Sequence, residues 1–151
     1  MSDGERGTLD AVLGLRIRLA HGALQRHFTD NFAGLGLTQK QVSVLWLVDE
    51  RPDVAQTDLA RTLQMDRATT MVIVHGLEKR GLVSRERATG DARRIALSLT
   101  PDGAAMLVDA RVAVERHEDW LKGRFTAREL TTLSGLLERI YDQDLLPSIA
   151  T

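Results

Sequence analysis

Arginine side chains gather in the middle of the chain. Arg85 and Arg87 are separated by one residue, and Arg93 directly precedes Arg94. Residues 58 to 100 carry eight basic and five acidic side chains, a net charge of +3, in a chain whose net charge is −1. Guanidinium groups bind phosphates and base edges through paired N–H donors. The cluster predicts a surface that contacts a polyanion, although a solvated face of mixed charge would give the same count.

Residues suited to catalysis or metal binding are few. The sequence contains no cysteine, which excludes thiolate zinc sites, cysteine nucleophiles and thiol redox switches. It lacks a nucleophile elbow, a phosphate loop, an HExxH pair and a dinucleotide fingerprint. His21 and His27 lie about 240° apart around a helix, so they do not converge on one metal ion within a chain. We therefore expect no catalysis, no metal and no resident cofactor.

The composition is that of a globular domain. The 151 residues are 43% hydrophobic and 27% charged, enough to bury a core without disulfide or metal staples. The longest apolar runs, Val44 to Val48 and Met71 to Val74, are too short to cross a membrane. No apolar signal core follows Met1. We expect a cytoplasmic protein with no membrane partner.

Apolar spacing and capping residues predict the first two helices. Apolar residues recur every three or four positions from Thr8 to Phe32, which predicts one long amphipathic helix there. The residues from Thr38 to Gln41 form a capping box, so a second helix should begin there and end at Arg51-Pro52-Asp53.

Two helices joined by a tight turn should follow. Residues 56–63 and 67–80 have helical patterns, and Asp66 suits the N-cap of the second because its carboxylate can accept from the N–H of Thr69. Gly81 suits the residue after this helix, where a left-handed conformation costs glycine little. This arrangement is a helix-turn-helix.

A hairpin and two helices complete the chain. Residues 82–87 and 94–99 read as strands around the polar tip 88–93, a wing attached to the helix-turn-helix. Thr100 and Pro101 open a helix that should run through Trp120, and Thr126 opens another whose apolar repeat reaches Leu145. The predicted fold is mainly α, or α+β through the wing: a winged helix-turn-helix with long terminal helices.

The ordered motifs between Leu37 and Leu107 resemble the MarR family of winged-helix transcriptional regulators. The matching segments are Leu59-Ala60, Met65-Asp66-Arg67, Thr69-Thr70, Leu77 to Val83, Asp91-Ala92-Arg93 and Leu99 to Gly103. The long terminal helices fit the dimerisation arms of that family, so the resemblance covers the whole chain.

The resemblance implies a homodimer that binds double-stranded DNA at a roughly palindromic operator, usually as a repressor that a small ligand releases. A twofold pair would space two reading helices about 34 Å apart, one turn of DNA. We expect residues 1–34 and 101–151 to form the dimerisation region and residues 35–100 the DNA-binding lobe, in one continuous unit. A monomeric helical bundle is the alternative.

The second helix of the motif should read the DNA. Its spacing places Thr70, Ile73, Val74 and Leu77 on the core. The side chains left outward are Arg67, Ala68, Thr69, Met71, Val72 and His75. Residues near the start of a recognition helix lie deepest in the groove, where Met71 and Val72 could contact thymine methyl groups. Alternatively, Met71 and Val72 pack on the wing or on a neighbouring helix, and His75 is a surface histidine without a function.

The wing should supply cations. In the family, an aspartate and an arginine spaced like Asp91 and Arg93 shape the tip, and the arginine enters the minor groove. Arg94 could enter the groove instead, while the other arginine pairs with Asp91 or a phosphate. The purely structural alternative is an Asp91–Arg93 salt bridge that only stiffens the tip. We also predict phosphate contacts from four side chains: Arg85, Arg87, Ser43 and Thr57.

Family effector pockets usually lie between the dimer arms and the DNA-binding lobe, bordered by the first, second and fifth helices. Residues of suitable chemistry there are Arg16, His21, Phe28, Trp46 and His117, with Trp120 as a further candidate. An aromatic wall with a cation suits a small aromatic or phenolic acid, whereas Phe28 and Trp46 could equally be core.

The alternative function is a winged-helix protein-interaction module without DNA binding.

Overall fold

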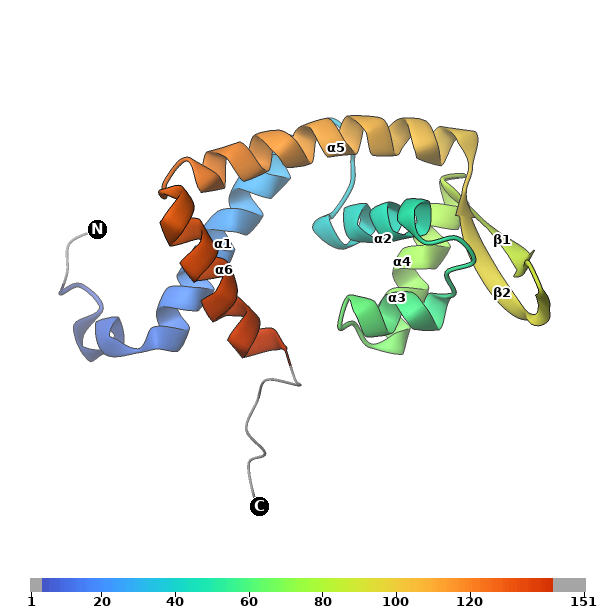
Figure 1. Cartoon of the computed structure of the whole chain (residues 1–151). Coiled ribbons are helices and arrows are strands. Elements are labelled where there is room, and N and C mark those ends of the chain that lie inside the picture. The colour runs from blue at the N-terminus through green and yellow to red at the C-terminus, as the bar shows by residue number, and fades with distance from the viewer. Residues whose placement is uncertain (1–3, 143–151) are drawn as a thin grey trace, which may run out of the picture. The chain divides into compact units, whose positions relative to one another are not determined.

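The computed structural model describes residues 4–142, which form two compact units, one up to Val114 and one from Glu115. Figure 1 shows the elements in chain order. The first unit contains η1 (Gly7–Ala11), α1 (Leu13–Phe32), α2 (Gln39–Glu50), α3 (Gln56–Thr62), α4 (Arg67–Lys79), β1 (Val83–Ala88), β2 (Asp91–Leu99) and most of α5 (Pro101–Lys122). The second contains the end of α5 and α6 (Ala127–Tyr141).

The start of the first helix departs from the sequence prediction. The prediction of one helix from Thr8 to Phe32 was wrong, because Val12 is extended (φ −86°, ψ 110°) and separates the 3-10 turn η1 from α1. Side-chain bonds hold that turn: Arg6 pairs with the Asp10 carboxylate at 3.1 Å, and Arg16 Nη2 donates to the Asp10 carbonyl at 2.9 Å.

The predicted helix-turn-helix is present. Asp66 Oδ1 accepts from the Thr69 N–H at 2.7 Å, and Gly81 follows α4 with φ +72°. Thr38 and Gln41 form the predicted capping box of α2. The lobe is held by a core in which Leu45, Leu59 and Leu77 are fully buried. Local capping and apolar burial together therefore fix the direction of α4.

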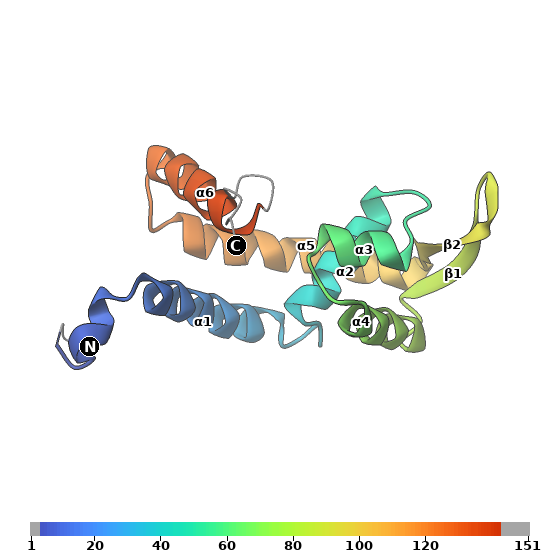
Figure 2. The ribbon, with the colours of Figure 1, turned by 90° about the horizontal axis from the view of Figure 1, so that it is seen from below.

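The wing is an antiparallel pair in which Val83 faces Leu99. The second strand starts at Asp91, three residues earlier than predicted. Its other edge is tied to the loop before α3 by the Leu97 N–H, which donates to the Val54 carbonyl at 2.8 Å. Figure 2 shows the hairpin extending beyond α3 and α4.

Thr100 joins the wing to α5. Its hydroxyl donates to the Gly81 carbonyl at 2.5 Å and accepts from the Gly103 N–H at 3.0 Å. A Cβ on Gly103 would lie 1.9 Å from the Leu82 carbonyl oxygen. Only glycine fits this approach, which explains the glycine in the Thr-Pro-Asp-Gly sequence at the start of α5.

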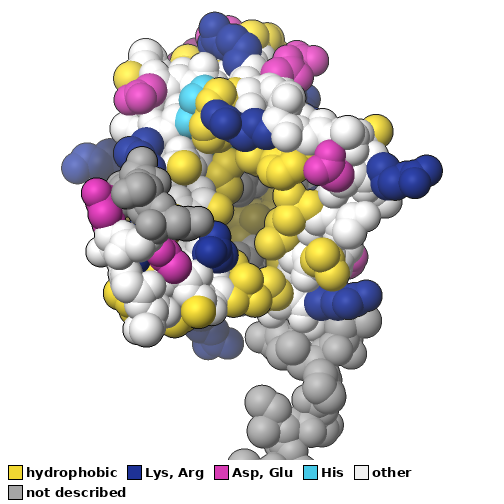
Figure 3. Space-filling view, turned by 90° about the vertical axis from the view of Figure 1, so that its left-hand side faces the viewer, with side chains coloured by type: hydrophobic (Ala, Val, Ile, Leu, Met, Phe, Trp, Pro, Cys, Tyr) yellow, Lys and Arg dark blue, Asp and Glu magenta, His cyan; other side chains and the backbone are white. Residues whose placement is uncertain are grey.

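The second unit contains an amphipathic helix, α6. Thr126 caps α6 through the predicted capping box. Leu136, Leu137, Ile140 and Tyr141 on α6 are all exposed, at 42–57%. Figure 3 shows that hydrophobic side chains, in yellow, reach the surface of the molecule. Leu145, the last residue of the predicted apolar repeat, lies outside the described residues.

Candidate nucleic-acid interface

The outward face of α4 has the predicted composition. Arg67, Ala68, Met71, Val72 and His75 are exposed and Thr69 is half-buried. On the opposite face, Thr70, Val74 and Leu77 are buried and Ile73 packs on the core. The face therefore offers a guanidinium, a hydroxyl and two apolar side chains near the start of the helix.

Asp66 holds the first turn of α4 in place. Besides the Thr69 N–H, it binds the Thr69 hydroxyl, which donates to Asp66 Oδ2 at 2.8 Å. The Thr69 N–H, followed by the Thr69 hydroxyl, lowers the pKa of the Asp66 carboxyl below its ordinary value. The charged cap fixes the Thr69 hydroxyl, whose oxygen can still accept from a base edge.

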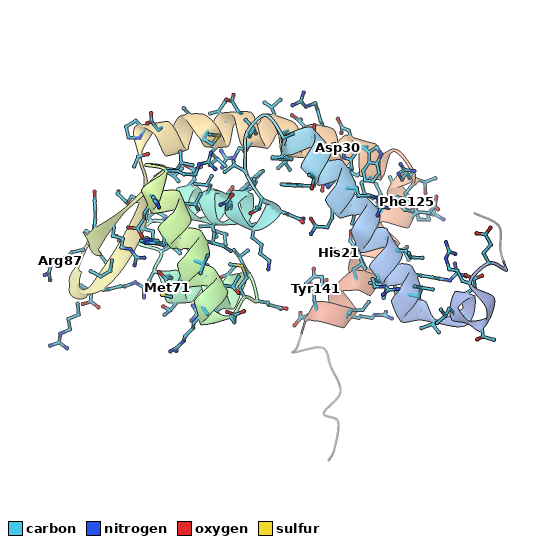
Figure 4. All side chains as sticks on the ribbon, turned by 180° about the vertical axis from the view of Figure 1, so that it is seen from behind. His21, Asp30, Met71, Arg87, Phe125 and Tyr141 are labelled. Atoms are coloured by element: carbon cyan, nitrogen blue, oxygen red, sulfur yellow. The ribbon has the colours of Figure 1, made fainter. Side chains whose placement is uncertain are left out.

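Met71 and Val72 are largely exposed in the described part of the chain. Their exposed fractions are 54% and 68%, and Figure 4 shows Met71 on the outer side of α4. Within the described residues, exposure of this extent leaves less than half of either residue's surface to pack on the wing or on a neighbouring helix. Two adjacent apolar side chains on an exposed face fit contact with thymine methyl groups.

The two wing arginines have different surroundings. Arg94 donates to a carboxylate oxygen of Asp58 and, through Nε, to the Asp53 carbonyl at 3.3 Å. Asp91 accepts from the backbone N–H of Arg93 at 3.0 Å. The Arg93 guanidinium is exposed and has no ion pair within residues 4–142. The sequence left open whether the second arginine pairs with Asp91 or a phosphate; in the free chain Arg94 pairs with Asp58.

The other four side chains predicted to contact phosphate differ in their surroundings. Arg85 binds Glu78 at 2.7 Å and Gln56 at 3.0 Å, so it ties the wing to α4 and α3. Arg87 lies on the outer side of the wing (Figure 4). Thr57 is exposed at the start of α3, whereas the Ser43 hydroxyl donates to the Gln39 carbonyl at 3.1 Å.

Sequence reasoning missed two residues near this face. Lys40 is exposed at the start of α2 and lines the same hollow as Thr69. Asp58 is buried in the first turn of α3, where its Oδ2 accepts from the Ala55 N–H at 2.9 Å. The acidic residue at a helix start was visible in the sequence, but its partner Arg94 is 36 residues away.

Known proteins share this architecture. A family model described as MarR family matches residues 37–95. A Thauera aromatica protein named as a regulatory protein for the hcr operon is 32% identical over 139 residues, which are 91% of this chain and 84% of that protein. The chain belongs to the MarR family. The repressor YetL of Bacillus subtilis is 30% identical, over 93% of this chain and 75% of its own.

Solved structures of the MarR-family repressor CouR resemble this chain. CouR bound to a 23-mer DNA duplex is 34% identical with a TM-score of 0.82, and the match covers 92% of this chain and 99% of CouR. CouR bound to p-coumaroyl-CoA is 32% identical with a TM-score of 0.84, over 93% of this chain and 99% of CouR. The mainly helical winged fold is thus the fold of the family.

The predicted effector residues of this MarR-family chain are not gathered at one place in the first unit. Phe28 is buried and stacks on Phe32 with ring centroids 3.9 Å apart. The Trp46 N–H donates to Glu50 at 2.8 Å, and Arg111 lies over its ring at 4.8 Å. The Arg16 guanidinium binds the Asp10 carbonyl. In the second unit, His117 is buried and stacks on Trp120.

Two hollows lie beside α1 in the first unit. The larger, of 560 Å³, is lined by His21, Gln25, Thr38, Gln39, Lys40, Ser43, Leu63, Met65, Thr69 and Ile73. The smaller, of 310 Å³, is lined by Phe28 among others. Of the predicted effector residues, His21 lines the larger hollow, whose lining also includes apolar Leu63 and Met65 and one lysine, Lys40.

The Asp58 cluster makes the stability of this MarR-family lobe sensitive to acid. The Ala55 N–H, with the nearby Arg94 and Arg61 guanidiniums, holds the pKa of the Asp58 carboxyl below its ordinary value. Ionised Asp58 therefore stabilises the fold above its unfolded pKa, about 3.9, and this contribution is lost as the pH falls through the lower folded pKa.

We expect Asp58→Asn to lower the free energy of unfolding at pH 7 by about 1–2 kcal/mol. It should also flatten the dependence on pH between about 5 and 3. Thermal unfolding followed by circular dichroism over this range checks both effects. Asp109→Asn, at an exposed position of α5, is the control. A variant whose unfolding temperature changes with pH as steeply as the wild type would contradict this role of Asp58.

Neither a membrane span nor a metal cluster is found in the part of the chain that the structure describes. No helix within residues 4–142 is long and apolar enough to cross a bilayer. The same residues bring together no group of three or more histidine, aspartate and glutamate side chains that could hold a metal ion.

Proposed function

We propose that this protein is a transcriptional repressor that binds operator DNA as a homodimer and is released by a small-molecule effector. The observation that carries the proposal is the exposed face of α4, with Arg67, Met71 and Val72, in a lobe whose wing presents the exposed Arg93 side chain. A reading helix in the major groove and an arginine in the minor groove suit these residues. The CouR repressor, with the same fold, has been solved on DNA.

The homodimer follows from apolar surface that each unit leaves uncovered. In the first unit, Leu13 is 68% and Ile17 41% exposed on α1. In the second, Leu137 and Ile140 on α6 are 42% and 57% exposed. Such surfaces are normally buried between subunits. We assign dimerisation to residues 1–34 and 101–151 and DNA binding to residues 35–100.

The effector we propose is a small aromatic or phenolic acid, or its thioester. CouR, at 32% identity, has been solved with p-coumaroyl-CoA. The 560 Å³ hollow supports this class, since apolar Leu63 and Met65 could hold a ring and Lys40 an anionic group. A regulator of this kind is not an enzyme and acts in the cytoplasm, where the operator is.

The Arg67→Ala and Arg93→Ala variants test the DNA contacts. Each should weaken binding to DNA from upstream of the protein's own gene by roughly tenfold to a hundredfold, because a lost base contact costs about 1–3 kcal/mol. Fluorescence anisotropy measures the affinity. Arg128→Ala, which removes the same charge from exposed α6, should change it by less than about twofold.

A wild-type protein that binds no upstream fragment at low salt would refute this function. The lobe would then be better explained as a protein-interaction module.

A further inference from the structure

Asp53 occupies an unusual position beside the wing. It lies in the loop between α2 and α3, and its φ of +60° is in the left-handed region. Aspartate tolerates this conformation better than most residues, because its short side chain bonds to nearby backbone. The loop can thus turn sharply and bring Asp53 against a segment far along the chain.

Two groups of Asp53 hold two parts of the wing. Its Oδ1 accepts from the backbone N–H of Thr89, at the tip, at 3.2 Å. Its carbonyl accepts from Arg94 Nε, on the second strand, at 3.3 Å. Thr89 and Arg94 lie on either side of Arg93, so the two bonds restrain the segment that carries the exposed guanidinium.

The wing needs such restraint. Its sheet has two strands, with a register irregularity between Arg87 and Ala88. A two-stranded ribbon is marginally stable by itself and twists easily. The Leu97 N–H bond to Val54 fixes the base of the second strand, whereas the bond from Asp53 to Thr89 reaches the tip.

We infer that Asp53 is a positioning residue, which sets the orientation of the wing tip and so directs Arg93 into the minor groove of DNA. This role rests on the proposed function and adds to it a determinant of specificity that does not touch DNA. In the minor groove, A·T pairs lack the guanine amino group, and A·T-rich tracts are narrow with a strong negative potential that attracts arginine. A misplaced tip should therefore lose the discrimination of A·T from G·C before it loses affinity for the duplex as a whole.

Two variants separate the side chain of Asp53 from its backbone conformation. Asp53→Gly keeps the left-handed conformation and removes the acceptor for Thr89. Asp53→Asn keeps both the conformation and an oxygen acceptor. Loss of the negative charge should strengthen binding of both variants to any duplex alike, so the quantity to compare is a ratio of affinities.

The experiment uses two duplexes. The first carries the site that footprinting locates upstream of the protein's own gene, and the second has G·C pairs in place of A·T pairs beneath the wing. By fluorescence anisotropy, the wild type and Asp53→Asn should prefer the first duplex by about tenfold. For Asp53→Gly the preference should fall to about twofold or less. In an Arg93→Ala background, Asp53→Gly should cause no further change, because the two residues act through one contact.

Three results would overturn the inference. The first is an Asp53→Gly variant that prefers the first duplex as strongly as the wild type does. The second is a loss of preference on adding Asp53→Gly to Arg93→Ala that equals its loss in the wild type, and the third is a wild type that binds both duplexes alike. If the wild type binds neither duplex, the proposed function fails and this role fails with it. If the wild type discriminates and Asp53→Gly does so equally, only the role of Asp53 is lost.

Discussion

Operator affinity should fall about a thousandfold or more when the salt concentration rises from 50 to 200 mM. If each subunit uses about four cations, a dimer neutralises about eight phosphates and releases the counterions bound to them. Arg67 of α4 and Arg87 and Arg93 of the wing are exposed and suit this role. Arg85 and Arg94 are already engaged with Glu78 and Asp58, so they would have to exchange partners.

The slope of log affinity against log salt concentration, measured by anisotropy, quantifies the effect. The Arg67→Ala variant removes one cation from each subunit, so the slope should become shallower by about 2. Arg128→Ala is again the matched control. A flat salt response of the wild type would mean that phosphate contacts do not hold the complex together.

Loss of the dimer should weaken operator binding by more than a hundredfold. The double variant Leu137→Asp with Ile140→Asp places two carboxylates on the apolar face of α6. Because burying a charged group is costly, these carboxylates oppose the burial of that face between subunits. A monomer holds only one half-site and loses the high effective concentration that the linked second subunit provides. We therefore expect a monomeric protein with weak, largely non-specific DNA binding.

Sedimentation velocity measures the oligomeric state of this variant, and anisotropy its affinity. Thr131→Asp with Ser134→Asp adds the same charge at exposed polar positions of α6 and should leave the dimer intact. A double apolar variant that stays dimeric, or a monomer that binds the operator as tightly as the wild type, would contradict the account of the dimer.

Features set by neighbouring residues could be predicted from the sequence. The caps at Thr38, Asp66 and Thr126 form as predicted, because each bond joins residues three positions apart. Helical spacing likewise separates buried Val74 and Leu77 from the exposed face of α4.

Features set by distant residues could not be predicted. Strand alternation places Arg93 and Arg94 on opposite sides, but the assignment depends on Asp58 in α3. The restraint of the wing by Asp53 likewise joins residues 36 positions apart. The break at Val12 escaped prediction because apolar spacing continues through it, while the Arg6–Asp10 ion pair and the bond from Arg16 to the Asp10 carbonyl hold a separate turn.

A hydroxyl-radical footprint of the wild-type protein on DNA from upstream of its own gene tests the central claim most directly. A dimer with two α4 helices and two wings should protect two symmetric half-sites whose centres lie about 34 Å apart, one turn of the duplex. Protection of one isolated half-site, or of none at a protein concentration that saturates binding, would contradict it.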